Sequence, residues 1–121
     1  MCAAAEGPPR VSHRNQIGEF EHLALSAILH LGDEAYALPI RQKIERLGRR
    51  TVSRGALYTT LMRLEEKGYL TSSVGDPMPK RGGRARRYFT VSEQGLAMLR
   101  ESRDRLMNFW SGLEDYLETG G

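Results

Sequence analysis

The sequence predicts a mostly α-helical fold with one small β-hairpin, an α+β class that ends in a long helix. Three observations support this prediction. Apolar residues recur at helical spacing through residues 52–67. Two short segments of alternating polarity follow and flank a basic, turn-rich loop. From residue 92 to about residue 118 the pattern is helical and free of proline. With 121 residues, the chain can bury the core of one domain but not of two.

The first helix is predicted over residues 20–31. Its apolar side chains recur at intervals of three and four residues and form one wide stripe. A stripe of this width needs two neighbouring elements. We expect the rest of the domain to cover one part of it and a partner subunit to cover the part that holds Phe20 and Leu23.

The second helix is predicted to begin near Tyr36 or Ala37. Pro39 then falls in the first turn, where its missing N–H leaves no helical hydrogen bond unmade. A basic turn over residues 48–50 leads to the third helix, and Thr51 with Val52 is expected to add a short third strand to the hairpin sheet. Four residues are expected to form the core face of this second helix: Tyr36, Ile40, Ile44 and Leu47.

The third helix, residues 52–67, has both of its ends specified locally. Ser53 can accept a hydrogen bond from a free backbone N–H at the start, and Gly68 suits a left-handed stop. One narrow stripe of leucines must face the core. The opposite side carries residues suited to contact with another molecule: Arg54, Gly55, Tyr58, Thr59, Met62 and Arg63.

A β-hairpin is predicted after this helix. Residues 69–74 and 85–91 both alternate in polarity, and the second segment sets Arg87 and Phe89 against Arg86 and Tyr88. The loop between them, GDPMPKRGGR, is basic and rich in glycine and proline. Helix, strand, basic loop and strand is the layout of a winged helix-turn-helix, a fold that binds nucleic acid.

The charge distribution supports this interpretation. The formal net charge is +3, but residues 36–90 hold 13 Lys and Arg against 4 Asp and Glu, and the remainder holds 5 against 11. Arginine outnumbers lysine by 15 to 3, and its planar fork suits phosphate oxygens and guanine edges. The basic charge therefore lies in the segment that holds the third helix and the hairpin.

The last helix is predicted to begin after Ser92, a good N-cap, and to continue to about residue 118. A compact winged domain offers no groove for its distal half, so a symmetric dimer is the expected way to cover that half. Phe109 and Tyr116 widen its apolar face. The heptad-like seam that defines this face contains Leu96, Leu99, Arg103, Leu106, Trp110, Leu113 and Leu117.

Three stretches carry a resemblance to a known family: AYALPIRQKIE, SRGALYTTLMRLEEKGYL and GGRARRYFTVSEQG. They resemble, in order and separation, the signature regions of PadR-family transcriptional regulators, and the resemblance extends from about Phe20 to the C-terminus. It implies a homodimer of the short-tailed type that binds an inverted-repeat operator in double-stranded DNA, usually as a repressor, and exchanges its last helix between subunits.

The resemblance also implies roles for single residues. The recognition helix, about residues 53–67, would enter the major groove, and the wing, residues 75–86, would lie on the backbone or in the minor groove. Arg54 is the candidate for a base contact, whereas Tyr58 and Thr59 suit contacts with phosphates. Alternatively, Tyr58 packs under the wing and Thr59 is only a residue of the helix surface. The wing itself could also be a solvated hairpin. The candidate DNA-binding residues are Ser53, Arg54, Tyr58, Thr59, Arg63, Lys80, Arg81, Arg84 and Arg86.

The expected organisation has three parts: a flexible N-terminal leader (1–16), a winged helix-turn-helix DNA-binding domain (17–91) and a C-terminal dimerisation helix (92–121). Trp110 could also stack on a small aromatic effector held between subunits, although an interface anchor is the simpler role for it. The expected dimer interface comprises Phe20, Leu23, Leu99, Leu106, Phe109, Trp110, Leu113 and Leu117.

Other classes of protein find little support in the sequence. No nucleophile has a base partner in its motif and no glycine-rich loop joins a strand to a helix, so neither an enzyme nor a cofactor is expected. Cys2 is the only cysteine, which precludes an internal disulfide, and the three histidines lack a metal-binding arrangement; His22 is expected to be exposed. No apolar run or signal peptide indicates a membrane segment, so a cytoplasmic protein is expected.

One alternative of a different class stays open. The winged-helix dimer could serve as a protein interaction module in which the basic face meets an acidic partner. Arg54 and Thr59 on the exposed face favour DNA, because a face that binds protein more often presents aromatic or aliphatic anchors. RNA is a weaker alternative, since no aromatic stacking platform is apparent.

Overall fold

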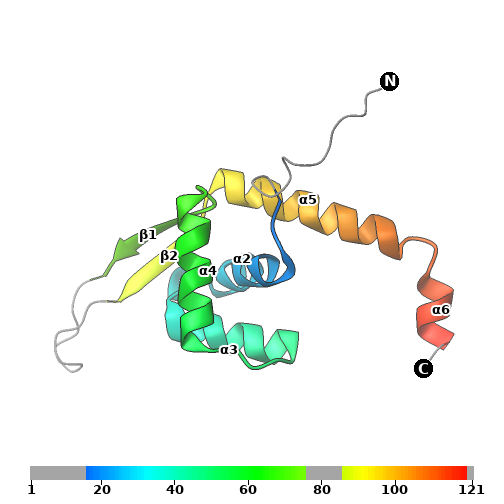
Figure 1. Cartoon of the computed structure of the whole chain (residues 1–121), viewed down its shortest axis with the longest axis horizontal. Helices are drawn as coiled ribbons and strands as arrows, with labels where there is room; N and C mark the ends of the chain where they lie inside the picture. The colour runs from blue at the N-terminus through cyan, green and yellow to red at the C-terminus, as the bar shows by residue number, and fades with distance from the viewer. Residues whose placement is uncertain (1–15, 76–85, 120–121) are drawn as a thin grey trace, which may run out of the picture.

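The computed structural model describes residues 16–75 and 86–119 and confirms the predicted class, a mostly helical fold with one two-stranded hairpin. Figure 1 shows the hairpin projecting from one side of the helices α2 to α4, while α5 runs away from them in another direction. The elements are α2 (Glu19–Leu31), the short 3-10 helix η2 (Gly32–Glu34), α3 (Ala37–Gly48), α4 (Arg54–Glu66), β1 (Leu70–Val74), β2 (Arg87–Val91), α5 (Glu93–Trp110) and α6 (Glu114–Thr119).

The core lies where α2, α3, α4 and the base of the hairpin meet. The leucine stripe of α4 faces it as predicted, because Leu57, Leu61 and Leu64 are each at most 1% exposed. Ile40 and Ile44 supply the core face of α3. The remaining large, fully buried side chains are Leu25, Leu70 and Phe89.

Both predicted ends of α4 are confirmed. The Ser53 hydroxyl accepts a hydrogen bond from the Ala56 N–H at 3.1 Å. At the other end Gly68 has φ +84°, a conformation that costs glycine little. The N–H groups of Gly68 and Tyr69 then donate to the carbonyls of Glu65 and Leu64, which satisfies two of the free carbonyls at the helix end. The orientation of this helix is therefore fixed by local bonds as well as by the core.

The predicted hairpin is confirmed, but the expected third strand is wrong. β1 and β2 pair antiparallel from Leu70 with Val91 to Val74 with Arg87. Thr51 and Val52 form no strand, because the Val52 N–H donates to a carboxylate oxygen of Glu45 at 2.9 Å. The outer edge of β2 bonds to the end of η2 instead: the Phe89 N–H donates to the Ala35 carbonyl at 2.9 Å.

The last helix is not continuous to residue 118 as expected. Its predicted start is confirmed, because the Ser92 hydroxyl accepts a hydrogen bond from the Gly95 N–H at 3.0 Å. The helix ends at Trp110, and the chain bends through Ser111 and Gly112 before α6 (Figure 1). Gly112 takes the left-handed conformation, with φ +87°, which ends the regular hydrogen-bonding pattern.

Three expectations about single residues are also corrected. Leu47 is 58% exposed and so does not belong to the core face of α3, while Tyr36 is half-buried at the N-cap of that helix. His22 is half-buried rather than exposed, and its Nδ1 lies 2.7 Å from the Ser102 hydroxyl of α5. This contact joins α2 to α5 at the point where α5 leaves the domain.

Candidate DNA interface

The outer face of α4 is open to solvent. Tyr58 is 51% exposed, which argues against the alternative that it packs under the wing, and Met62 is 39% exposed. A shallow hollow on this face is lined by Tyr58, Thr59, Met62, Arg63 and Glu66. Arg54 and Gly55 are exposed in the first turn, where no atom of the described residues lies within 4 Å of the position that a Gly55 Cβ would take. Backbone and side chains of α4 are thus both accessible along one side.

Two arginines on this face form no ion pair with any described residue. Within residues 16–75 and 86–119, the salt bridges involve Arg50, Lys67 and Arg103, and neither Arg54 nor Arg63 is among them. Arg54 stands at the N-terminal end of α4, where free backbone N–H groups and the helix dipole also favour an anion. Both guanidinium groups are therefore available to phosphate or to a base edge.

The two arginines of the basic turn before α4 differ in their surroundings. Arg49 ends α3 in a left-handed conformation, with φ 54°, and its side chain is exposed. Arg50 instead lies over the Phe20 ring, with its guanidinium carbon 5.2 Å from the ring centroid and a nitrogen 3.9 Å from Glu19. Arg49 adds positive charge beside the recognition helix, whereas Arg50 packs against α2.

The wing is described only at its base. Lys80, Arg81 and Arg84 lie outside the described residues. Arg86 is half-buried, and its guanidinium carbon lies 4.2 Å from the centroid of the Tyr36 ring. A side-chain hydrogen bond with Tyr88 raises the pKa of Arg86 above its ordinary value, so this group stays charged. Of the four wing cations predicted to bind DNA, the one described residue is already engaged within the chain.

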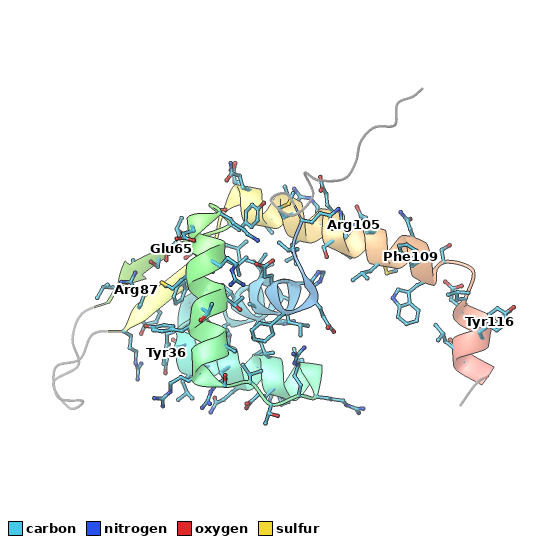
Figure 2. The ribbon with its side chains drawn as sticks, in the orientation of Figure 1. Tyr36, Glu65, Arg87, Arg105, Phe109 and Tyr116 are labelled. Atoms are coloured by element: carbon cyan, nitrogen blue, oxygen red, sulfur yellow. The ribbon has the colours of Figure 1, made fainter. Side chains whose placement is uncertain are left out.

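The expected dimer residues fall into two groups. Phe20, Leu23 and Leu99 are half-buried and pack against the core of their own chain. The distal residues are uncovered in the single chain: Leu106 is 50% exposed, Phe109 78%, Trp110 48%, Leu113 42% and Leu117 51%. Figure 2 labels Phe109 near the end of α5 and Tyr116 on α6, both far from the helices of the core.

Other kinds of site are not apparent in the described part of the chain. Residues 16–75 and 86–119 contain no group of three His, Cys, Asp or Glu side chains placed to hold a metal ion. In the same residues, no helix has the length and apolar character needed to cross a membrane. The open face of α4 and the uncovered end of the chain are thus the two surfaces that call for an explanation.

Comparison with known proteins identifies the family of the chain. The profile of the family described as "Transcriptional regulator PadR-like family" matches residues 27–101, which include α3, α4 and the wing. The chain belongs to this family. Members of this family are transcriptional regulators that bind DNA, and the chain has the fold of such a regulator.

Solved structures agree with this assignment. A PadR family transcription regulator from Clostridium difficile R20291 is 21% identical, with a TM-score of 0.65 over 83% of this chain and 99% of that one. A PadR-like transcriptional regulator from Bacillus cereus ATCC 14579 is 21% identical, with a TM-score of 0.65 over 81% and 90%. A PadR family regulator from Eggerthella lenta DSM 2243 is 26% identical, with a TM-score of 0.64 over 90% and 88%. No curated protein matches the sequence.

Sequence reasoning missed the cluster at the base of the wing. Tyr36 was expected in the core face of α3, but its ring lies 5.5 Å from the Tyr88 ring, edge to face, and beneath Arg86. The alternation of β2 does place Arg86 and Tyr88 on one face, which is a usable signal. Nothing in the sequence links that face to Tyr36, which precedes it by fifty residues.

Proposed function

We propose that this PadR-like protein is a homodimeric repressor that binds an inverted-repeat operator. In this proposal α4 enters the major groove and Arg54 contacts a base, while Ser53, Tyr58, Thr59 and Arg63 fix the helix on phosphates. The wing cations Lys80, Arg81 and Arg84 bind the backbone or the adjoining minor groove. The protein acts in the cytoplasm, where it has access to DNA.

The observation that carries the proposal is the contrast between the two sides of α4. The leucines on one side are buried, whereas the arginines on the other side form no salt bridge within residues 16–75 and 86–119. A helix held this firmly can place a guanidinium against one base pair, because little freedom is lost on binding. A basic patch on a mobile segment would bind any duplex.

The dimer is supported by the uncovered apolar side chains of α5 and α6. Single monomeric proteins rarely expose a contiguous apolar surface that includes tryptophan and phenylalanine. A second copy of the chain covers this surface and sets the two α4 helices on one face of the duplex, which suits an inverted repeat.

An aromatic effector is the finer part of the proposal. Trp110 is 48% exposed in the single chain, so a flat aromatic compound between subunits would stack on its indole. Trp110 is also the only tryptophan in the chain. Quenching of its fluorescence by aromatic acids and phenols therefore reports binding directly, and the absence of saturable quenching across such a set removes this part of the proposal.

The decisive experiment is fluorescence anisotropy with the protein's own upstream DNA and with a scrambled duplex, at several salt concentrations. A preference for the native duplex with affinity that falls steeply with salt supports the proposal. Equal, salt-dependent binding to both duplexes contradicts an operator within that DNA. No binding at low salt contradicts the proposal altogether and favours a protein interaction module.

The same assay tests Arg54. We expect Arg54→Ala to weaken operator binding by about 1–3 kcal/mol and to reduce the preference over scrambled DNA, because a bidentate base contact is lost. Arg100→Ala removes the same charge from an exposed position on α5 and serves as the matched control. If both variants keep the full preference for the operator, Arg54 makes no base contact.

A further inference from the structure

Three side chains pack together at the base of the wing. The guanidinium carbon of Arg86 lies 4.2 Å from the centroid of the Tyr36 ring, and that ring meets the Tyr88 ring edge to face at 5.5 Å. Figure 2 shows Tyr36 beside the end of the hairpin from which the wing loop departs. We call Tyr36, Arg86 and Tyr88 the wing clamp.

The wing clamp lies at the end of the hairpin, where residues 76–85, the wing loop, connect β1 to β2. The Gly75 N–H donates a hydrogen bond to the Arg86 carbonyl at 2.7 Å. A Cβ at position 75 would lie 2.9 Å from Cε1 of Tyr88, so only glycine allows this approach of the strand to the ring. The wing loop therefore departs from a base that is closed by one backbone bond and packed under an aromatic ring.

The wing clamp also joins this base to the helix-turn-helix. Tyr36 is the N-cap of α3, and the preceding residue, Ala35, accepts the hydrogen bond from the Phe89 N–H of β2. On the other face of the hairpin, Arg87 donates to the Ser72 hydroxyl at 2.9 Å, and Ser72 donates to Glu65 of α4 at 2.7 Å. One face of the hairpin base is thus tied to α3 and the opposite face to α4.

We propose that the wing clamp is a set of positioning residues that holds the base of the hairpin at a fixed angle to α4, so that the wing cations and the recognition helix contact one duplex together. This inference rests on the proposed function. It reassigns Arg86, whose charge serves the contact with Tyr36 and not a DNA phosphate. Tyr36, which carries no charge, becomes a determinant of how many phosphates the protein contacts.

The salt dependence of binding separates this role from the alternatives. Each phosphate contact adds about 0.9 to the slope of log affinity against log salt. Tyr36→Leu removes the ring but not a charge, so by itself it alters no phosphate contact. If the clamp positions the wing, this variant lowers the slope; a Tyr36 hydroxyl that bound phosphate itself would be lost equally in Tyr36→Phe.

The experiment uses the full-length protein and two fluorescent duplexes, the native upstream DNA and its scrambled control. We expect Tyr36→Leu to weaken binding about 5- to 30-fold, because a cation–π contact that is open to solvent on one side is worth about 2- to 5-fold and a dimer has two. We expect Tyr36→Phe to bind like the wild type, since it keeps the ring. Unfolding of each variant by urea confirms that the protein is folded under the binding conditions.

The second arm repeats Tyr36→Leu in a chain whose wing cations are replaced, Lys80→Gln with Arg81→Gln and Arg84→Gln. If the clamp acts through the wing, Tyr36→Leu has no further effect there, because no wing cation is left to position. An equal loss in both backgrounds, or an unchanged salt slope in the first, overturns the inference. Failure of the wild type to bind either duplex would overturn the proposed function instead.

Discussion

The two ends of the C-terminal helical region carry the same apolar spacing, yet only one end is covered. Leu96 and Leu99 of α5 are half-buried, and Ser102 is only 6% exposed. Past Ser102 the spacing continues through Leu106 and Trp110, each about half exposed, because no described element of the chain lies over them. The spacing of apolar residues defines a face of the helix, but another element must cover that face before it is buried. Here α2 and β2 cover only the first half of α5.

The largest effect is expected when charged residues replace apolar residues in the uncovered half of this region. In the proposed dimer, Trp110→Asp with Leu113→Asp places two carboxylates in the seam and should leave a monomer, because a buried, unpaired charge costs about 3–5 kcal/mol. Light scattering after size exclusion should give twice the 13.6 kDa of one chain for the wild type and 13.6 kDa for the variant. Asn108→Asp, an exposed position outside the seam, is the control. A dimeric double variant would mean that the seam is not the interface.

Two phenylalanines sharpen the comparison through stability. Phe89 is 2% exposed and Phe109 is 78% exposed. We expect Phe89→Ala to lower the free energy of unfolding by about 3–5 kcal/mol, because it removes a buried ring and leaves a cavity. Phe109→Ala should leave the folding of the winged domain almost unchanged and weaken dimerisation. Urea unfolding at several protein concentrations separates the two effects, since only dimerisation depends on concentration.

If Phe109→Ala destabilises the chain as much as Phe89→Ala at every concentration, the distal half is covered within one chain. The comparison between the two halves of the region would then fail.

Two helical glycines extend the comparison to the DNA-binding face. A Cβ at Gly95 would overlap the Tyr69 carbonyl oxygen and lie 3.0 Å from Val91, so Gly95→Ala should destabilise the protein by about 1–3 kcal/mol. A Cβ at Gly55 would lie within 4 Å of no atom of the described residues, so Gly55→Ala should stabilise α4 by about 0.5–1 kcal/mol. We expect Gly55→Ala nevertheless to weaken operator binding if DNA approaches this turn. Unfolding and anisotropy of both variants test this, and a Gly55→Ala protein with unchanged affinity would place the duplex elsewhere.

The smallest effect concerns the border between the two halves. Burial lowers the pKa of His22, whose Nδ1 lies 2.7 Å from the Ser102 hydroxyl. Below pH 6.5 the unfolded chain therefore binds a proton at His22 more readily than the folded chain does. The free energy of unfolding falls as the pH decreases through 6.5, and it is retained above that pH. Urea unfolding at pH 7.5 and 5.5 should show a smaller loss for His22→Gln than for the wild type. An equal loss in both proteins would show that His22 does not contribute.

Much of the fold could be predicted because its signals are local. The ends of α4 are specified by Ser53 and Gly68, and the start of α5 by Ser92, each through a bond to a nearby backbone group. The leucine stripe of α4 needs only helical spacing. These features do not depend on where distant segments lie, so they can be inferred from the sequence without a structure.

The wrong predictions concern residues whose conformation is set by distant side chains or by competing local groups. Val52 was expected in a strand, but a carboxylate seven residues earlier accepts its N–H. Gly112 was absorbed into a long helical pattern, although its left-handed conformation ends α5 two residues before it. His22 and Tyr36 are placed by partners 80 and about 50 residues away. Helical periodicity carries no information on such pairs.

The sequence likewise predicted the surroundings of some residues of the candidate site but not of others. The exposed face of α4 follows directly from the position of its buried stripe, so Arg54, Thr59 and Arg63 could be placed by elimination. Arg86 could not, because its half-buried position depends on a ring from α3. Charge and spacing indicate which residues are available to DNA, whereas packing decides which of them remain free.

The most direct test of the account is the mass of the complex between the wild-type protein and its operator, measured by sedimentation. We expect two chains on one inverted repeat, and only weak binding to a duplex that holds a single half-site. One chain bound to the full operator, with the same affinity for the half-site, would contradict it, because the uncovered end of the chain would then have no part in reading DNA.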